Sequence, residues 1–538
     1  MPAYPSLRRV VTLALVAALM GAVWAPSASA RGFRLGVAAS EVTRSSAILW
    51  TRADQPGDVV LKLATGRSRA ALSGPLTVFN AFASSANDNT VQRRVTGLAP
   101  GTVYYYRFSR PGGDVSRIGT FETAPRPDAD RTIRFAFSGD ADAQRASGQS
   151  QPFYNGLPGN NGFGAESFGI YRQMWREGND FNVNLGDTIY SDSEVGGAPP
   201  ALTVARKWAK YRQNLGLANL RDLRAFSGVY NHWDDHEFIN DFTPPENPGG
   251  IYQAGVTAFR DYMPAHYTRA TGLYNHQRWG KNLEIFRLDE RSFRSAKASA
   301  HHTCDNPQTH QPDLAPTAPQ STRNVFALVV PSLSQPVSQK CKDRINDPTR
   351  TLLGKAQLSR FLHDVDASSA TWKVIINEVP IQMFYALPYD RWEGYEAERK
   401  QLLRGLQRRA VKNLVFLTTD THANMLNVVR FRTLESGGPL PSHYDEFVTG
   451  PVSTKTFSRE IDEATGNPGS GDLVDAAFFS PPPPNGVGMP CSNVNVYSYA
   501  EVRASATGLT VTAKDVHGNI VRDQSDDTTP CVMTLTAG

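Results

Sequence analysis

The sequence predicts an α/β layered domain that follows a smaller all-β domain, and two observations lead to this prediction. Residues 33 to about 123 lack helical periodicity and contain short apolar runs separated by turn residues, as a β-sandwich does. From Thr132 onward, strand-like and helix-like stretches alternate, which indicates helices packed on sheets. The 538 residues are 40% hydrophobic, which is ample for two such cores.

The chain begins with an expected export signal over residues 1–30. Arg8 and Arg9 precede the apolar run 10–23, and Ala28-Ser29-Ala30 has the small residues of a signal-peptidase site. A membrane anchor is the alternative, but about 14 apolar residues are few for a bilayer span. We therefore expect a secreted or periplasmic protein that the Sec or twin-arginine machinery exports, without stable membrane insertion.

The charge of the chain excludes one class of obligatory partner. Lys and Arg total 56 and Asp and Glu total 51, a net charge of +5 with no basic run. So small an excess over so long a chain predicts no specific nucleic-acid partner. The oligomeric state stays open.

Residues 31–123 are expected to form the all-β domain. Its clearest strand-like runs are 47–51, 59–63 and 103–108. The segment 95–106 resembles the strand-turn-strand of immunoglobulin-like fibronectin type III domains, in which a tyrosine pins the loop it follows. Pro125 and Pro127 then indicate a linker over 124–131, because paired prolines interrupt both helix and sheet.

Residues 132–538 are expected to form the α/β domain. Its strand-like runs are 132–138, 180–185, 228–233, 283–288, 372–377 and 413–419. Helical stretches between them are 166–177, 204–226, 355–365 and 395–409. Sheets of this class carry their chemistry beyond the carboxyl ends of the strands.

Acidic side chains follow four of these strands. They are Asp140, Asp187, the pair Asp234-Asp235 and Asp420, the last with His422 two residues on. Each alone fits a solvated loop carboxylate, but four at one sheet edge would repel one another unless cations neutralise them. Oxygen-rich ligands with few histidines favour Fe³⁺, Ca²⁺, Mn²⁺ or Mg²⁺ over Zn²⁺.

The four cysteines are an even number in a chain with an export signal, and none has the spacing of a metal site. We expect structural disulfides, of which Cys304–Cys341 and Cys491–Cys531 is the most local of three possible pairings.

Several motifs make the α/β part recognisable. They are Gly186-Asp187-Thr188-Ile189-Tyr190, Trp233-Asp234-Asp235-His236-Glu237 with Asn240-Asp241, Leu288-Asp289-Glu290-Arg291-Ser292-Phe293-Arg294, and Asp420-Thr421-His422. As a set they resemble the calcineurin-like metallophosphoesterases of the purple acid phosphatase kind, and their wording is similar to that of the PhoD-type alkaline phosphatases. The resemblance implies a four-layer α/β sandwich of two mixed β-sheets flanked by helices, preceded by an immunoglobulin-like domain. It also implies export by the twin-arginine route.

The resemblance further implies a two-metal site. Asp187 would bridge the metals, while Tyr190, His422 and Asp140 would hold Fe³⁺. Asp235, Asp420 and Asn377 would hold the second ion, Ca²⁺. One departure matters: the best-known PhoD-type enzymes have cysteine where this chain has Asp140, so Mn²⁺, Zn²⁺ or Mg²⁺ become credible at either position. Two alternatives remain, a Tyr190 packed on the sheet and an Asn377 that caps a turn.

Two catalytic residues are expected on the same grounds. His236 stands beside a ligand, where it would protonate the leaving group or steady a phosphate oxygen; a structural histidine is the alternative. Arg291 is the candidate phosphate clamp, with an ion pair to Asp289 as the alternative.

The predicted function is therefore that of an exported, metal-dependent phosphoesterase in which a metal-bound hydroxide attacks phosphorus. Phosphate monoesters and diesters are both candidate substrates. The first alternative is a phosphodiesterase or phospholipase D-type hydrolase of the same family, and the second is a non-catalytic surface binding protein on a degraded phosphatase fold.

Overall fold

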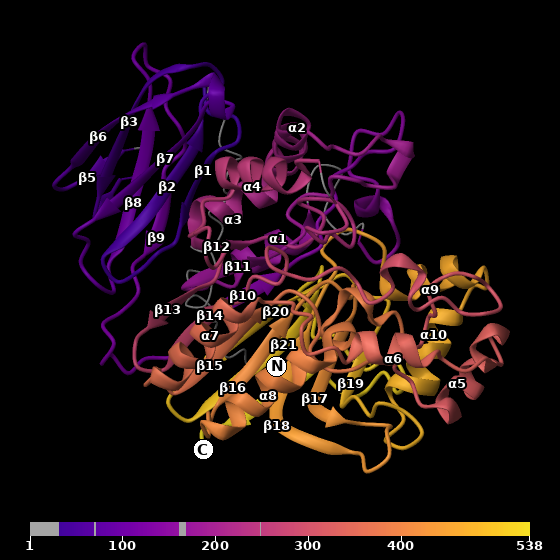
Figure 1. The fold of residues 1–538 in the computed structure, drawn as a ribbon. Helices are drawn as coiled ribbons and strands as arrows, with labels where there is room; N and C mark the ends of the chain where they lie inside the picture. Colours follow the sequence, from indigo (N-terminus) through magenta and orange to yellow (C-terminus); the bar gives the residue numbers. More distant parts are fainter. Residues whose placement is uncertain (1–31, 69–70, 161–167, 248) are drawn as a thin grey trace, which may run out of the picture.

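The computed structural model describes residues 32–68, 71–160, 168–247 and 249–538 (Figure 1). The export signal expected over residues 1–30 lies outside the described residues. Within these ranges, every helix is too short or too polar to cross a bilayer.

The first part of the chain consists of strands, drawn in indigo and violet in Figure 1. They are β1 Val37–Ser40, β2 Ser46–Arg52, β3 Gly57–Ala64, β4 Gly66–Arg67, β5 Leu72–Ser73, β6 Thr77–Ala83, β7 Thr90–Thr96, β8 Val103–Ser109 and β9 Gly119–Glu122. Strands β6-β3-β8-β9 form one sheet. The hydroxyl of Tyr104 accepts a hydrogen bond from the Ala99 N–H at 2.9 Å, so the tyrosine pins its preceding loop as expected.

Strands β4 and β5 pair only with each other, whereas β1, β2 and β7 belong to a larger sheet. Strand β1 pairs in parallel with β12, Gly228–His232, so β1, β2 and β7 continue a nine-stranded sheet of order β22-β21-β20-β10-β11-β12-β1-β2-β7. Its other members are β10 Ile133–Ser138, β11 Phe181–Leu185, β20 Ser498–Ala504, β21 Gly508–Asp515 and β22 Val532–Thr536. The two parts of the chain therefore share a sheet.

A second, seven-stranded mixed sheet has the order β13-β14-β15-β16-β18-β17-β19. Its strands are β13 Asn275–Trp279, β14 Leu283–Arg287, β15 Trp372–Asn377, β16 Leu414–Thr418, β17 Asn424–Arg432, β18 Leu440–Val448 and β19 Cys491–Asn493. Helices α7 Lys355–Ala367 and α8 Glu396–Arg408 cover its outer face. The outer face of the first sheet carries α1 Gly169–Arg176, α2 Val204–Leu215, α3 Ala218–Phe226 and α4 Ile251–Tyr262.

Side chains along the central strands alternate between the two faces of the sheet, and this alternation explains why each sheet is covered on both faces. In β10, Phe135 and Phe137 lie in the core between the two sheets, whereas Ala136 faces the helices. In β15, Val374 joins the same central core and Ile375 faces α7 and α8. Strands with apolar residues on both faces must be covered on both faces, so the result is a helix-sheet-sheet-helix sandwich of two mixed sheets.

The predicted helix over 204–226 is in fact two helices. Helix α2 ends at Leu215 and α3 begins at Ala218, with Gly216 between them. Glycine has poor helix propensity, and the apolar periodicity on both sides hid this break.

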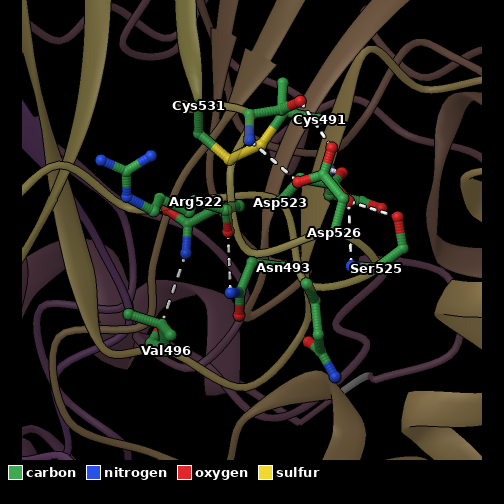
Figure 2. Close-up of a disulfide and its surroundings, with 12 residues drawn as sticks. Cys491, Asn493, Val496, Arg522, Asp523, Ser525, Asp526 and Cys531 are labelled. Carbon is green, nitrogen blue, oxygen red and sulfur yellow. Dashed lines mark hydrogen bonds between the residues drawn. A yellow bond between two sulfur atoms is a disulfide. The ribbon is translucent and has the colours of Figure 1, made fainter.

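Both predicted disulfides are present. Cys304–Cys341 lies within the insertion between β14 and β15, where it ties the segment after β14 to α6, Gln339–Ile345. Cys491–Cys531 joins β19 to the segment before β22 (Figure 2). The segments α5 Gln320–Phe326, α9 Phe457–Thr465 and α10 Ser470–Val474 lie at the same end of the molecule as α6 (Figure 1).

Candidate metal centre

The loops after β10, β11 and β16 turn sharply at their acidic residues. Asp140, Asp187, Asp420 and His422 all have positive φ angles, 64°, 47°, 65° and 56°. Non-glycine residues adopt this conformation at an energetic cost, and such strain concentrates at functional sites. The turns bring side chains from the first sheet, at β10 and β11, together with side chains from the second, at β16.

One group of ligand atoms consists of Asp140, Asp187 and His422, whose atoms lie within 4.8 Å of one another. The hydroxyl of Tyr190 is 3.1 Å from Nε2 of His422, so the phenol lies against the same group. Nδ1 of His422 is 2.7 Å from Oε1 of Glu460, which fixes the ring with Nε2 toward the carboxylates.

A second group shares Asp187 with the first. Asp187, Asp235 and His236 offer atoms within 4.8 Å of one another, and Asp235 also groups with Asp234 and Asp420. A fourth group joins Asp235 to Asp241 and Asp390. Asp187 is therefore shared by two adjacent groups of candidate ligand atoms.

The electrostatics of the described side chains fit metal ions. Burial raises the pKa of Asp140 to about 6. Burial, with the neighbouring carboxylates of Asp235 and Asp234, raises the pKa of Asp187 well above its usual value, and the pKa of Asp420 is raised in the same way. Oδ2 of Asp140 is buried without a hydrogen-bond partner. Buried, unpartnered carboxylate oxygens beside a phenol and an imidazole are the donor set of a hard cation.

His236 is held by a carboxylate that sequence reasoning missed. Its Nδ1 lies 2.6 Å from Oδ1 of Asp192, and the Asn240 N–H donates to the other oxygen at 2.7 Å. The His236 ring stacks on Tyr190 with centroids 4.0 Å apart. Burial lowers the pKa of His236, but the carboxylates of Asp187, Asp235 and Asp192 outweigh it and raise the pKa well above the usual value. These three carboxylates thus favour the protonated imidazole.

These groups line a cavity of about 640 Å³. Its acidic floor includes Asp187, Asp235 and Asp420, and its walls include the apolar side chains of Leu387, Tyr389, Tyr154 and Phe457. Besides the histidines His236 and His422, Arg391 and Lys455 are the basic residues among the described residues that line it. Such a cavity has room for a small ester with an apolar or aromatic alcohol.

Arg291 has a different environment from the one expected of a phosphate clamp. It is fully buried, its Nε donates to Asp234 Oδ1 at 2.5 Å, and its two terminal nitrogens lie 2.9 and 2.8 Å from the oxygens of Asp390. It also lies 4.0 Å from Asp235 and 3.8 Å from Asp420. Arg291 does not line the cavity. The alternative expected from the sequence was an ion pair with Asp289, but the guanidinium pairs with Asp234 and Asp390 instead.

The side-chain amide of Asn377 is occupied by hydrogen bonds at both its nitrogen and its oxygen. Its Nδ2 donates to the Val379 carbonyl at 2.6 Å, and its Oδ1 accepts from the Trp392 indole at 2.9 Å. Both ends of the amide are used within the core, so this arrangement supports the turn-capping alternative and not the ligand role.

Asp390, Glu460 and Glu237 also belong to the site. They were not identified from the sequence, because they lie outside the strand ends or act through another residue. Asp390 lies in a short 3-10 turn after β15, and Glu460 lies in α9. Glu237 accepts hydrogen bonds from Thr188 and from the Asp234 N–H, which joins the loops after β11 and β12. Only Glu237 had a local signal, since it belongs to the Asp-His-Glu motif.

Comparison with known proteins agrees with this geometry. A family model for PhoD-like phosphatases matches residues 156–476, more than half of the chain, and one for their N-terminal domain matches residues 18–125. Alkaline phosphatase D of Bacillus subtilis (strain 168) is 25% identical over 444 residues, 74% of this chain and 66% of that relative. The chain thus spans less than two thirds of that relative's length.

Two solved structures share the fold. The structure of PhoD has a TM-score of 0.68 at 19% identity and covers 95% of this chain and 92% of that chain. The purple acid phosphatase from yellow lupin (Lupinus luteus) seeds has a TM-score of 0.53 at 11% identity, with 93% and 73% covered. At these identities the likeness shows a metallophosphoesterase-like fold.

Proposed function

The chain belongs to the PhoD-like phosphatases, a family of phosphoric ester hydrolases, and from this premise we propose that it is a metal-dependent phosphoesterase with a dinuclear site. The observation that carries the proposal is Asp187, whose carboxylate belongs to two adjacent ligand groups in one cavity. A carboxylate shared between two cation sites suits hydrolysis at phosphorus, where charge develops on several oxygens at once.

The residues of the chain would divide the work as follows. Asp140, Asp187, Tyr190 and His422 would hold one cation, and Asp235 and Asp420 would complete the site of the second with Asp187. When bound, the cations would neutralise phosphoryl oxygens and activate a water molecule. His236 would give a proton from Nε2 to the leaving oxygen, because Asp192 occupies Nδ1 and favours the protonated ring.

Fe³⁺ is the ion we propose beside Tyr190, because a phenolate suits a hard, strongly acidic cation, and Ca²⁺ is proposed for the second position. The aspartate at position 140 keeps Mn²⁺, Zn²⁺ and Mg²⁺ as alternatives at either site. Iron-loaded protein should absorb visible light, and Tyr190→Phe should abolish that band.

Arg291 takes a positioning role in this scheme. Its guanidinium lies between Asp234 and Asp390 and near the ligands Asp235 and Asp420. It would hold these acidic loops together when they converge on the cations.

Phosphate monoesters are the substrate class we put first, and diesters, including phospholipids cleaved by a phospholipase D-type reaction, are the second candidate. The volume of the cavity and its apolar wall are compatible with either. Secretion or a periplasmic location fits the expected export signal and the two disulfides.

The test is hydrolysis of a chromogenic phosphate monoester and of the matching diester, before and after chelation. We expect hydrolysis that chelation abolishes and that added metal ions restore. Faster turnover of the diester would select the second candidate. Metal-loaded protein that hydrolyses neither ester would favour a non-catalytic binding protein.

A further inference from the structure

One buried acidic side chain outside the metal centre has no counter-charge among the described residues. Asp475 begins the π-helical turn Asp475–Phe479, directly after α10. The residue is 0% exposed, neither carboxylate oxygen has a partner at full hydrogen-bond geometry, and only a weaker interaction with the Ser492 hydroxyl favours the ionised form. A buried carboxylate with so little hydrogen bonding and no counter-charge is strongly unfavourable, so such a group in a folded protein requires an explanation.

The groups near Asp475 make its ionised form still less favourable. The charged groups that act on it are the carboxylates of Asp523 and Asp472, and only the hydroxyl of Ser492 favours its ionised form. Burial, reinforced by these two acids, raises the pKa of Asp475 to about 7. None of the three acids forms an ion pair with a basic side chain within the described ranges.

The segments near Asp475 carry several oxygen-bearing side chains that hydrogen bonds and a disulfide hold in place. The Ser492 N–H donates to Asp523 Oδ2 at 2.9 Å, and the Ser525 N–H donates to Oδ1 of the same carboxylate at 2.9 Å. Ser492 follows Cys491, whose disulfide with Cys531 fixes β19 beside the loop of Asp523; Figure 2 shows Asp523 and Ser525 next to this disulfide. The hydroxyl of Ser480 lies 3.5 Å from that of Ser492.

We propose that Asp475 is a ligand of a divalent cation of the calcium type, with the Ser492 hydroxyl and the Asp523 carboxylate as further oxygen donors. The donors are all oxygens, and the nearby sulfur atoms are tied up in the disulfide, so the site selects a hard ion over zinc. The cation would supply the missing counter-charge and would join the π-helical turn to the C-terminal strands. None of its three donors belongs to the metal centre, so its role is structural.

The test compares wild-type protein with Asp475→Asn, both full-length and both loaded at the metal centre. After equilibration with CaCl₂ and removal of free ion, the variant should contain about one equivalent less calcium per chain. Its melting temperature should respond less to added CaCl₂ than that of the wild type, because a ligand that binds only the folded state raises stability. Phosphoesterase activity at moderate temperature should be unchanged.

Asp526→Asn is the matched control, because Asp526 is an exposed acid in the same loop as Asp523 and should leave the calcium content unchanged. If Asp475→Asn does not fold, Ser492→Ala, which keeps every carboxylate, should raise the calcium concentration needed for thermal stabilisation. The proposal is overturned if Asp475→Asn has the same calcium content and the same thermal response to CaCl₂ as the wild type. If Asp475→Asn does not fold, the same result for Ser492→Ala overturns it. Asp475 would then be a neutral carboxylic acid.

Discussion

Adjacent residues in the loop after β12 are assigned different tasks. Asp235 belongs to three ligand groups, whereas the Nδ1 atom of His236 is occupied by Asp192, whose carboxylate favours the protonated ring. Holding cations and moving a proton are separable, because metal content and turnover are measured independently.

His236→Ala should therefore keep its metal content and lose turnover by roughly 10²–10⁴-fold, as the loss of a general acid does. The loss should shrink for esters of very acidic alcohols, which need little protonation when the P–O bond breaks. Asp187→Asn should lose metal together with activity, since an amide cannot supply the charge of a bridging carboxylate. Metal analysis and turnover on both variants check this; loss of metal from His236→Ala alone would make His236 a ligand.

Arg291 offers a second test at this scale. Because it is fully buried between Asp234 and Asp390, Arg291→Met would leave two acids without their counter-charge. Breaking a buried ion pair on one side costs on the order of 3–5 kcal/mol, so the variant should unfold at lower denaturant concentration. A phosphate clamp would behave differently: its loss would raise KM and leave unfolding unchanged.

At the scale of elements, apolar runs predicted most of the strands because a strand buried on both faces has few sequence alternatives. The runs 132–138, 372–377 and 413–419 became β10, β15 and β16 with small shifts at their ends. The acids directly after strands were found for the same reason: the end of the strand fixes where the side chain goes.

What the sequence could not predict depends on loops and on packing. Asp390 enters the centre from an irregular segment with no periodic pattern. Asn377 follows a strand as the ligands do, but the Trp392 indole, distant in sequence, takes its amide oxygen. Arg291 stands in a motif shared with phosphatases, and only the fold shows that acids surround its guanidinium.

Helix α2 positions the centre through one buried lysine. Nζ of Lys207 donates to Ser191 Oγ and to the Phe238 carbonyl, both at 2.8 Å, and its side chain is fully buried. It thereby joins the loop of Tyr190 to the loop of His236. Lys207→Met should lower activity by about 10–100-fold, the usual effect of losing a residue that orients ligands. Lys210→Met, one turn away on the same helix, is the control.

The same lysine predicts a pH effect on stability. Burial lowers the pKa of Lys207 from 10.5 to about 8. Between these values the unfolded chain binds a proton that the folded chain does not, so stability rises with pH across this window. Denaturant unfolding at pH 8 and pH 10 should show wild type gaining stability relative to Lys207→Met; a constant difference would contradict the assignment.

At the scale of the molecule, the all-β part is built into the α/β part. The two share the nine-stranded sheet, and one apolar core includes Leu49 and Phe108 together with Phe135 and Val374. Buried Arg287 of β14 also pairs with Glu41, directly after β1. Sharing of sheet and core predicts one cooperative unfolding transition for both parts.

Asp88 provides the test of this coupling. Its carboxylate accepts hydrogen bonds from Arg52 of β2, Arg212 of α2 and Tyr262 of α4, so one residue of the all-β part holds two helices of the other. Burial raises the pKa of Asp88, but the bonds from Arg52 and Tyr262 outweigh it and lower the pKa below 3.8. A lowered pKa stabilises the fold above the unfolded value, and this contribution is lost as the pH falls through the folded value.

Asp88→Asn should therefore destabilise the whole molecule at neutral pH by about 1–3 kcal/mol, the range for hydrogen bonds to a charged group. The difference from wild type should shrink as the pH falls below about 4, where the carboxylate of the unfolded chain begins to protonate, and vanish below the lowered pKa of the folded state. Calorimetry should show the single transition moving as a unit, because the helices and the strands that Asp88 joins unfold together. A transition that splits in two, with only the N-terminal part shifted, would mean that the shared sheet does not couple the two parts.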